Sequence, residues 1–189
     1  MRTRALFLDR DGVINVNHGY VHQPQNFEFI DGIFDFARAA HAQHYKLVVI
    51  TNQAGIARGF YSEQQFHELT VWMCEQFVSQ GAPISRVYFS PYHPSEGLGA
   101  YKKDDFSRKP HPGMILQAQQ EFNLDLECSV LIGDKASDIQ AGIAAGVGCN
   151  ILFAQERPAE LPSDAYQRIT KLRDALSFIT RDQSQAVEQ

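Results

Sequence analysis

The sequence is poor in cysteine and has neither a long apolar run nor a surplus of basic residues. Its three cysteines, Cys74, Cys128 and Cys149, show no close pairing and no metal-ligand spacing, which excludes a disulfide framework and indicates thiols in a reducing compartment. The apolar stretch that begins at Ala5 ends at Asp9, too soon for a signal peptide. No run approaches the ~20 residues of a membrane span, so we expect a cytoplasmic protein without a membrane partner.

Acidic residues outnumber basic ones, with 22 Asp and Glu against 17 Lys and Arg and a formal net charge of −5. This balance gives no electrostatic footprint for nucleic acid, and an anionic ligand would need a local source of positive charge. The 189 residues, 44% hydrophobic and 21% charged, are typical of a globular chain. We expect one domain over residues 1–180 and a polar tail over 181–189.

Short apolar segments alternate with helical patterns, which is typical of a parallel sheet with crossover helices. Strands are expected at Ala5–Leu8, Leu47–Thr51, Val87–Ser90, Val130–Gly133 and Cys149–Phe153. Helices are expected at Ile33–Tyr45, after a capping box formed by Ser62 and Gln65, at Pro112–Phe122, at Ala136–Gly146 and, as a fifth candidate, at Lys171–Thr180. The sequence therefore predicts a doubly wound α/β fold with helices on both faces. The intervals between these elements leave no room for a separate cap domain.

Four of the expected strands are followed by polar residues that can do chemistry. Ligands of doubly wound sheets bind outside the carboxyl ends of the strands, near the point where the strand order reverses. An acid at one such end is commonly a helix cap or a turn former, but four polar ends in one chain favour a functional site. They are Asp9-Arg10-Asp11-Gly12, Thr51-Asn52-Gln53, Arg108-Lys109-Pro110 and Gly133-Asp134-Lys135.

Asp9-x-Asp11-Gly12, Thr51, Lys109 and Asp134 resemble the four motifs of the haloacid dehalogenase (HAD) superfamily of phosphatases. Over roughly residues 4–155, the chain is most similar to the bacterial D-glycero-D-manno-heptose 1,7-bisphosphate 7-phosphatases of that superfamily. The segments that carry this similarity are 9–16, 18–21, 26–29, 51–59, 108–114 and 133–135. The resemblance implies a HAD-like Rossmannoid fold. It also implies a hydrolase that removes the 7-phosphate of the heptose bisphosphate, in the synthesis of nucleotide-activated heptose for lipopolysaccharide and related cell-surface polysaccharides.

The motif residues suggest how such a phosphatase would work. Asp9 is expected to be the nucleophile, because a carboxylate can take a phosphoryl group and form an aspartyl-phosphate. The resemblance implies Mg²⁺ held by the side chains of Asp9 and Asp134 and the carbonyl of Asp11, and Mg²⁺ prefers such oxygen ligands. Asp11 is expected to protonate the leaving oxygen and then to deprotonate water. Lys109 and Thr51 are expected to bind the transferring oxygens.

The resemblance makes Asn17, His18, Gly19, Tyr20, Asn52, Gln53, Ala54 and Arg108 the groups that read the substrate. Arg108 could contact a second phosphate in bidentate fashion. Asp134 could cap a helix as well as bind metal, and Lys135 either pairs with site carboxylates or faces solvent. We expect a monomer that acts on a small sugar bisphosphate. Two alternatives stay open: a histidinol-phosphate phosphatase, and a non-catalytic sugar-phosphate-binding protein.

One part of the family pattern is missing from this sequence. Proteins of this group usually hold a structural zinc through Cys-x-His and Cys-x-Cys in the loop before Arg-Lys-Pro. Ser90, Tyr92, Asp105 and Ser107 stand at those four positions, and none is a good zinc ligand in this setting. We therefore predict no structural zinc in the loop 91–110. Its order should come from its prolines and from packing of Tyr88, Phe89, Tyr92, Tyr101 and Phe106.

Overall fold

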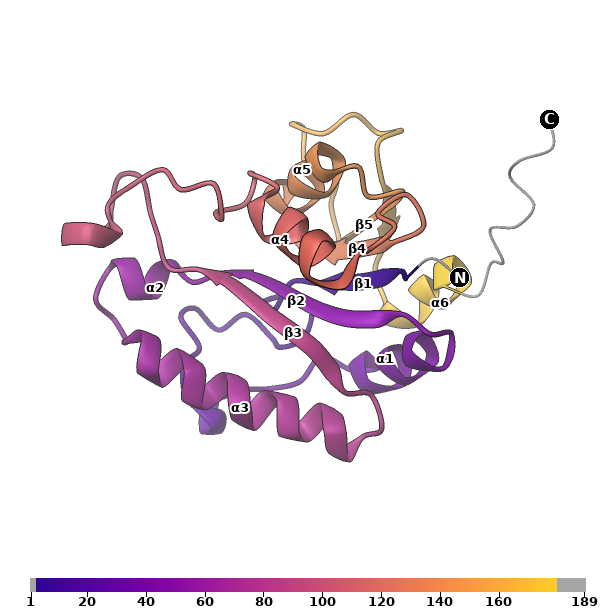
Figure 1. The fold of residues 1–189 in the computed structure, drawn as a ribbon, viewed down its shortest axis with the longest axis horizontal. Helices are drawn as coiled ribbons and strands as arrows, with labels where there is room; N and C mark the ends of the chain where they lie inside the picture. Colours follow the sequence, from indigo (N-terminus) through magenta and orange to yellow (C-terminus); the bar gives the residue numbers. More distant parts are fainter. Residues whose placement is uncertain (1–2, 180–189) are drawn as a thin grey trace.

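The computed structural model describes residues 3–179, which contain a six-stranded parallel sheet of strand order β3-β2-β1-β4-β5-β6 (Figure 1). The strands are β1 (Ala5–Leu8), β2 (Lys46–Asn52), β3 (Ile84–Ser90), β4 (Val130–Gly133), β5 (Cys149–Phe153) and β6 (Gln167–Ile169). The predicted doubly wound parallel sheet is confirmed. Strand β6 was not predicted, because two of its three residues are exposed and polar. The tail predicted for 181–189 lies outside the described residues.

Helices cover both faces of the sheet, with α1 and α3 on one side and α4 and α5 on the other (Figure 1). The helices are α1 (Ile33–Ala42), α2 (Ala54–Ala57), α3 (Glu63–Ser79), α4 (Gly113–Phe122), α5 (Ala136–Ala145) and α6 (Leu176–Ile179). Single 3-10 turns lie at Pro24–Asn26, Gly99–Tyr101 and Leu172–Ala175. As far as the structure describes it, to Ile179, the helix proposed for Lys171–Thr180 is a 3-10 turn followed by α6. The one-turn helix α2 was not predicted. Within residues 3–179, every helix falls short of the length and hydropathy that crossing a bilayer requires.

Alternate residues of the strands point to opposite faces of the sheet and build two separate cores, as the period of two along a strand requires. Leu6, Leu8 and Val49 face α1 and α3 and share a core with Phe36 and Met73. The intervening positions of the same strands join a second core with α4 and α5, made of Phe7, Val48, Ile50, Met114 and Ile139 among others. Burial on both faces explains why the strand sequences are apolar at nearly every position.

The start of α3 is set by local sequence. Ser62 Oγ accepts a hydrogen bond from the Gln65 amide at 3.2 Å, and the Ser62 amide donates to Gln65 Oε1 at 2.9 Å. This is the predicted capping box, which satisfies amide groups at the helix start that lack a partner within the helix. The helix then buries Phe66 and Leu69 on the face that the spacing of apolar residues indicated. A fixed start for α3 also fixes the end of the segment 53–61, which carries residues of the site.

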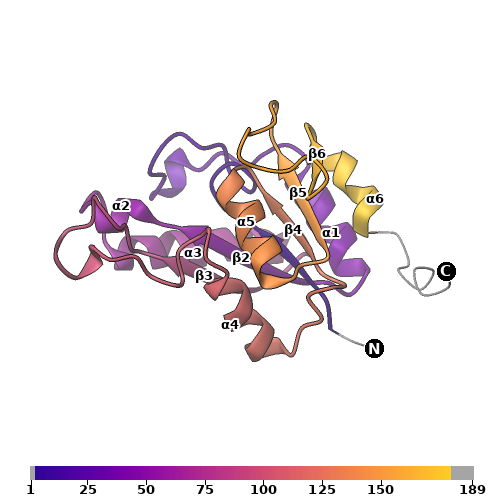
Figure 2. The same cartoon turned by 90° about the horizontal axis from the view of Figure 1, so that it is seen from above.

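The strand order reverses between β1 and β4. The chain passes from β1 outward through β2 to β3, and β4 then returns to the other side of β1 (Figure 2). At their carboxyl ends the two strands remain paired, since the Asp9 amide donates to the Ile132 carbonyl at 3.0 Å. The residues that follow these strands, Asp9 and Asp134, are thereby placed at the position where doubly wound sheets bind ligands.

Candidate active site

Asp9 and Lys109 form a buried ion pair at the carboxyl ends of the strands. Lys109 Nζ lies 2.9 Å from Asp9 Oδ1 and 2.6 Å from Asp138 Oδ1, and it donates to the Ile50 carbonyl at 3.0 Å. The Arg10 amide donates to Asp9 Oδ1 at 2.7 Å. Burial by itself would lower the pKa of Lys109, but the carboxylates of Asp138 and Asp9 raise it above its ordinary value. The site therefore holds a permanent positive charge beside the carboxylate predicted to be the nucleophile.

Three carboxylates, those of Asp9, Asp134 and Asp138, each place an oxygen within 4.8 Å of the others. Burial is the main reason that the pKa of Asp9 is raised to about 8. The positive charge of Lys109 acts to lower this pKa, while the negative charges of Asp138 and Asp134 raise it further. Burial also raises the pKa of Asp134. Asp134 Oδ1 is buried and has no hydrogen-bond partner among residues 3–179. A buried carboxylate oxygen without a donor, in an all-oxygen cluster of excess negative charge, suits a hard divalent cation such as Mg²⁺.

Asp138 is the member of this cluster that the sequence analysis missed. Its side chain is almost fully buried, and its Oδ2 accepts a hydrogen bond from the Lys135 amide at 2.9 Å, at the start of α5. Asp138 is thus the carboxylate that caps this helix, and the capping role considered for Asp134 is wrong. The spacing Asp134-x-x-x-Asp138 was the available signal, because residues four apart near a helix start can turn toward the same site. Lys135 Nζ lies 3.9 Å from Asp134 Oδ2, which makes a loose pair with a site carboxylate.

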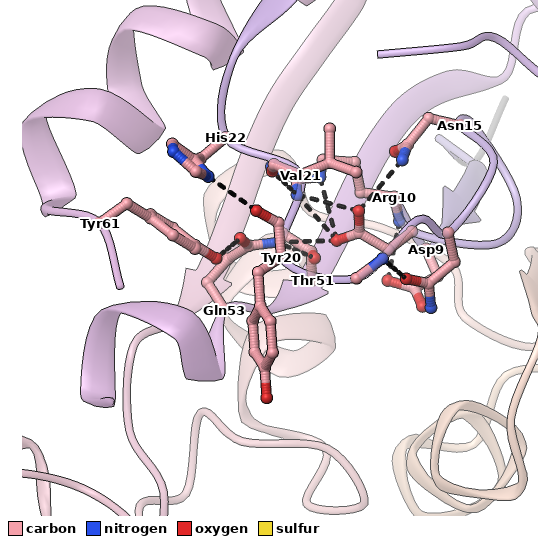
Figure 3. A network of polar contacts seen from close by, with 12 residues as sticks. Asp9, Arg10, Asn15, Tyr20, Val21, His22, Thr51, Gln53 and Tyr61 are labelled. Carbon is pink, nitrogen blue, oxygen red and sulfur yellow. Dashed lines mark hydrogen bonds and ion pairs between the residues drawn. The ribbon is translucent and has the colours of Figure 1, made fainter. Parts of the chain in front are cut away.

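The Asp11 carboxylate is held by four N–H donors. Arg10 donates to it twice, from Nε at 3.1 Å and from Nη2 at 2.9 Å. Asn15 Nδ2 and Gln53 Nε2 each donate at 3.1 Å. Arg10 is itself 1% exposed and also donates to the Val21 carbonyl at 2.7 Å, which ties the loop after β1 to the site (Figure 3). Arg10 belongs to the Asp-x-Asp-Gly motif, where its own role was not predicted, and the structure shows that it orients the predicted acid.

Gln53 links Asp11 to Thr51 and Tyr61. Its Nε2 donates to Thr51 Oγ1 at 2.8 Å and its Oε1 accepts from Tyr61 Oη at 2.5 Å (Figure 3). Burial raises the pKa of Tyr61 to about 12, so its hydroxyl remains a donor. The His22 ring stacks on the Tyr61 ring, with the ring centroids 5.0 Å apart. Since Thr51 Oγ1 accepts from Gln53, its own hydroxyl proton is oriented to donate elsewhere. Thr51 is therefore suited to hydrogen-bond an anionic oxygen placed at the strand end.

Gly12 allows the turn after β1 to approach the metal-ligand candidates. Its φ is +102°, a backbone conformation that side chains disfavour. A Cβ at this position would lie 2.2 Å from Asp134 Oδ2. The glycine of the Asp-x-Asp-Gly motif is thus required both by the backbone conformation and by the close approach of Asp134.

A cavity of about 590 Å³ opens beside these groups and is lined by Asp11, Lys109 and Lys135. Seven of the residues predicted to bind substrate also line it: Asn17, Gly19, Tyr20, Asn52, Gln53, Ala54 and Arg108. The exception among the residues predicted to bind substrate is His18, whose Nε2 lies 3.0 Å from Glu28 Oε2 and which lines a neighbouring depression. Asn52 fixes the backbone of Lys109, donating to its carbonyl and accepting from its amide, both at 3.0 Å.

Polar contacts and part of the predicted aromatic packing hold the loop 91–110. Phe89 and Tyr101 pack against a buried apolar cluster, as predicted. The side chain of Phe106 is 60% exposed, so the prediction that it helps to order the loop by packing is wrong. Ser107 Oγ instead lies 2.6 Å from Asp105 Oδ1 and 3.0 Å from Ser90 Oγ. These oxygens belong to three of the four positions where the family pattern has zinc ligands, and they are partnered with one another. The donor set, which lacks thiolate and imidazole, does not fit a structural zinc.

We expect the affinity for Mg²⁺ to rise with pH. The raised pKa of Asp9, about 8, means that a cation competes with a proton for this carboxylate below that pH. The dissociation constant should therefore fall by up to about tenfold per pH unit between pH 6 and pH 8. Calorimetric titration of the chelator-treated protein at three pH values measures it. A dissociation constant that is unchanged with pH would contradict the assignment of these buried carboxylates as ligands, and Asp134→Asn should remove the binding.

Known proteins with similar sequences match nearly the whole length of this chain. A family model for HAD-hydrolase-like proteins matches residues 106–167. A D-glycero-α-D-manno-heptose-1,7-bisphosphate 7-phosphatase of Burkholderia mallei is 52% identical over 180 residues, covering 95% of either chain. A D-glycero-β-D-manno-heptose-1,7-bisphosphate 7-phosphatase of Vibrio cholerae is 44% identical over 183 residues, covering 96% of this chain and 98% of the relative.

Two solved structures have the same fold. One is a protein from Mesorhizobium loti that has been proposed to be a HAD-like phosphatase, with a TM-score of 0.83 and 33% identity, covering 94% of this chain and 86% of the other. The other is the D,D-heptose 1,7-bisphosphate phosphatase of B. bronchiseptica complexed with magnesium and phosphate, with a TM-score of 0.80 and 24% identity. This second match covers 93% of this chain and 97% of the other, and at that identity it supports the fold alone.

Proposed function

The chain belongs to the D-glycero-D-manno-heptose-1,7-bisphosphate 7-phosphatases of the HAD-like hydrolases, and we propose that its buried site removes the 7-phosphate of that sugar by means of an aspartyl-phosphate on Asp9. The observation that carries the chemical part of this proposal is the contact of Lys109 with Asp9 beside the unpartnered oxygen of Asp134. A nucleophilic carboxylate, a fixed cation and an oxygen for a divalent metal meet there. This set of groups is what transfer of a phosphoryl group between anions requires.

In the first step, an oxygen of Asp9 attacks the phosphorus while the bond from phosphorus to the sugar oxygen breaks. Asp11 supplies a proton to the leaving sugar alkoxide. Lys109 and Thr51 bind the oxygens of the phosphoryl group during its transfer. Asp9 and Asp134, with the Asp11 carbonyl, would hold Mg²⁺, which would supply charge to neutralise the phosphate beside the carboxylate.

In the second step, water replaces the enzyme at phosphorus. Asp11, now a carboxylate, takes a proton from that water, which attacks the aspartyl-phosphate and releases inorganic phosphate and free Asp9. Arg10, Asn15 and Gln53 hold the Asp11 carboxylate between the two steps and so keep it at the edge of the cavity. Splitting the hydrolysis in this way gives each half-reaction a nearby nucleophile and a nearby proton carrier.

Substrate recognition is assigned to the cavity walls. Arg108 is suited to the second phosphate, because its guanidinium forms paired hydrogen bonds with phosphate oxygens. Asn17, Gly19 and Tyr20 line the same cavity and are suited to the sugar. With this substrate the enzyme would act in the cytoplasm, as a monomer, on the route to nucleotide-activated heptose.

A substrate panel tests the proposal. We expect kcat/KM for the heptose 1,7-bisphosphate to exceed that for histidinol phosphate and for an aryl phosphate by at least about 100-fold, because only the bisphosphate engages both Lys109 and Arg108. Both anomers belong in the panel, since one is named for the Burkholderia mallei relative and the other for the Vibrio cholerae relative. A higher kcat/KM for histidinol phosphate would overturn the sugar assignment. Binding of the bisphosphate without turnover in Mg²⁺ would favour a non-catalytic protein.

A further inference from the structure

The two ends of the long loop 91–110 are joined by side chains. Ser90, at the end of β3, is fully buried, and its Oγ lies 3.0 Å from Ser107 Oγ. Ser107 Oγ also lies 2.6 Å from Asp105 Oδ1, which accepts the Ser107 amide at 3.0 Å. A hydroxyl has one proton, which the carboxylate attracts most strongly, so Ser90 is left to donate to Ser107. The loop therefore closes on itself directly before Arg108.

A second set of contacts joins this closure to the start of the loop. Lys103 Nζ lies 2.7 Å from Asp105 Oδ2 and 3.9 Å from the centre of the Tyr92 ring. The carbonyl of Tyr92 accepts a hydrogen bond from Arg108 Nη1 at 2.9 Å. We call Ser90, Tyr92, Lys103, Asp105 and Ser107 the clasp. The clasp is connected to Arg108 in two ways: Ser107 directly precedes it in the chain, and the Tyr92 carbonyl accepts its hydrogen bond.

The charge at the centre of the clasp is stable. Hydrogen bonds from Lys103 and Ser107 lower the pKa of Asp105 to about 2, so its carboxylate stays ionised throughout the range in which enzymes are assayed. Asp105 uses both of its oxygens, one toward Lys103 and one toward Ser107. Loss of its charge would therefore release Lys103 and weaken the hydrogen bonds from Ser107.

Arg108 is held on both sides in the sequence. Before it stands the clasp, and after it stands Lys109, whose backbone Asn52 grips through two hydrogen bonds. The guanidinium is half-buried and lines the cavity that Asp11 and Lys109 also line. An arginine fixed in this way loses little rotamer freedom when it meets an anion, so the binding free energy of that anion is not spent on ordering the side chain.

We propose that the clasp is the positioning device that sets this enzyme's preference for a substrate with a second phosphate, by aiming Arg108 without a metal ion. The proposal rests on the proposed function, since it assumes that Arg108 meets the second phosphate. Asp105 is a positioning residue here, because it acts through Arg108 and touches neither the reacting atoms nor the cavity surface. Four of the five clasp residues, all except Lys103, stand at the positions of the zinc ligands in the family pattern. The clasp orders the loop with oxygen, ammonium and ring contacts instead.

The variant Asp105→Asn tests the clasp. The amide keeps the shape but cannot hold Lys103 as a charge, so Tyr92 and Arg108 lose their fixed position. We expect KM for the sugar bisphosphate to rise about tenfold, while kcat on an aryl phosphate, which has no second phosphate, stays within about twofold. Asp31→Asn is the control, since Asp31 is an exposed acid outside the loop 91–110 and outside the cavity lining.

A double-mutant cycle with Arg108→Ala decides whether the effect passes through Arg108. In the Arg108→Ala background, Asp105→Asn should cause no further rise in KM for the bisphosphate, because the group that the clasp aims is gone. Equal and independent effects in both backgrounds would overturn the proposal, as would an equal loss of turnover on the aryl phosphate. If Asp105→Asn does not fold, Lys103→Met and Ser107→Ala each break one arm and must show the same dependence on Arg108.

The same measurements separate this inference from the proposed function. A wild-type enzyme that does not prefer the bisphosphate would count against the function itself. Suppose instead that the wild-type enzyme prefers the bisphosphate. If Asp105→Asn then leaves KM unchanged, or raises KM equally in the Arg108→Ala background, the result would count against the clasp alone.

Discussion

Asp9→Asn is expected to lower kcat by at least about 1,000-fold and to leave the fold intact, because an amide cannot form the aspartyl-phosphate. The substitution keeps the size of the side chain and an oxygen that can accept from the Arg10 amide and Lys109. What it removes is the nucleophilic charge. This effect should be the same for the sugar bisphosphate and for an aryl phosphate, since both would be hydrolysed through the same carboxylate.

The burial of Asp9 determines whether Asp9→Asn is more or less stable than wild type. Because burial raises the pKa of Asp9 to about 8 in the folded protein, the folded state holds a proton that the unfolded state releases near pH 4. Metal-free wild type should therefore lose stability as the pH rises from about 4 to 8. The uncharged asparagine carries no such penalty, so the variant should be at least as stable as wild type at pH 8 in chelator.

Two measurements check this prediction. Turnover of an aryl phosphate in Mg²⁺ gives the loss of kcat, and thermal unfolding in chelator at pH 6 and pH 8 gives the stability. Asp31→Asn, a change of an exposed acid that does not line the cavity, is the matched control and should alter neither quantity. Turnover by Asp9→Asn equal to that of wild type would remove Asp9 as the nucleophile. Wild-type stability that rises between pH 6 and pH 8 in chelator would contradict the electrostatic description of the site.

The meeting of Asp9 with Asp134 could be predicted from sequence because it follows from topology. Two buried parallel strands, each ending in an acid, bring those acids together wherever the strands are neighbours across the reversal of strand order. The burial of the strands that precede these acids, Ala5–Leu8 and Val130–Gly133, could also be predicted, because the strands carry no polar side chain. These parts of the site depend on the backbone alone.

Asp138 and Arg10 could not be assigned in the same way. Both are polar residues in positions that sequence alone reads as a helix surface and a turn, yet each is about 1% exposed. Their burial depends on partners distant in the chain, Lys109 for Asp138 and the Val21 carbonyl for Arg10. Contacts of this kind depend on where loops fold back, for which local propensity and periodicity give no signal.

The contacts that order the loop 91–110 could also be predicted from the sequence only in part. The family pattern identified which positions lack zinc ligands, but it could not show what replaces them. Aromatic residues were the natural candidates, and Tyr92 does contact Lys103 and Tyr101. Phe106 is nevertheless exposed, because its neighbours Asp105 and Ser107 turn inward to the clasp and leave it on the outer side.

Lys109 carries the second large prediction, because it is a buried cation between two buried carboxylates. Removing one partner of such a pair leaves uncompensated charge in a medium of low polarity, which typically costs about 3–5 kcal/mol. Lys109→Met keeps the apolar length of the side chain but leaves the carboxylates of Asp9 and Asp138 without their cation. We expect a loss of unfolding free energy of that size in chelator, greater at pH 8 than at pH 5, because protonation of the stranded carboxyl groups relieves the charge at low pH.

The double variant Lys109→Met/Asp138→Asn separates the two tasks of Lys109. Neutralising Asp138 removes one of the stranded charges, so part of the lost stability should return. Turnover should not return, since the ammonium that binds the transferring oxygens is still absent and its loss alone should lower kcat by about 100-fold or more. Chemical unfolding and aryl phosphate turnover measure the two effects, with Lys102→Met, a change of an exposed neighbour, as the control. Recovery of activity together with stability would show that Lys109 only balances buried charge and takes no part in phosphoryl transfer.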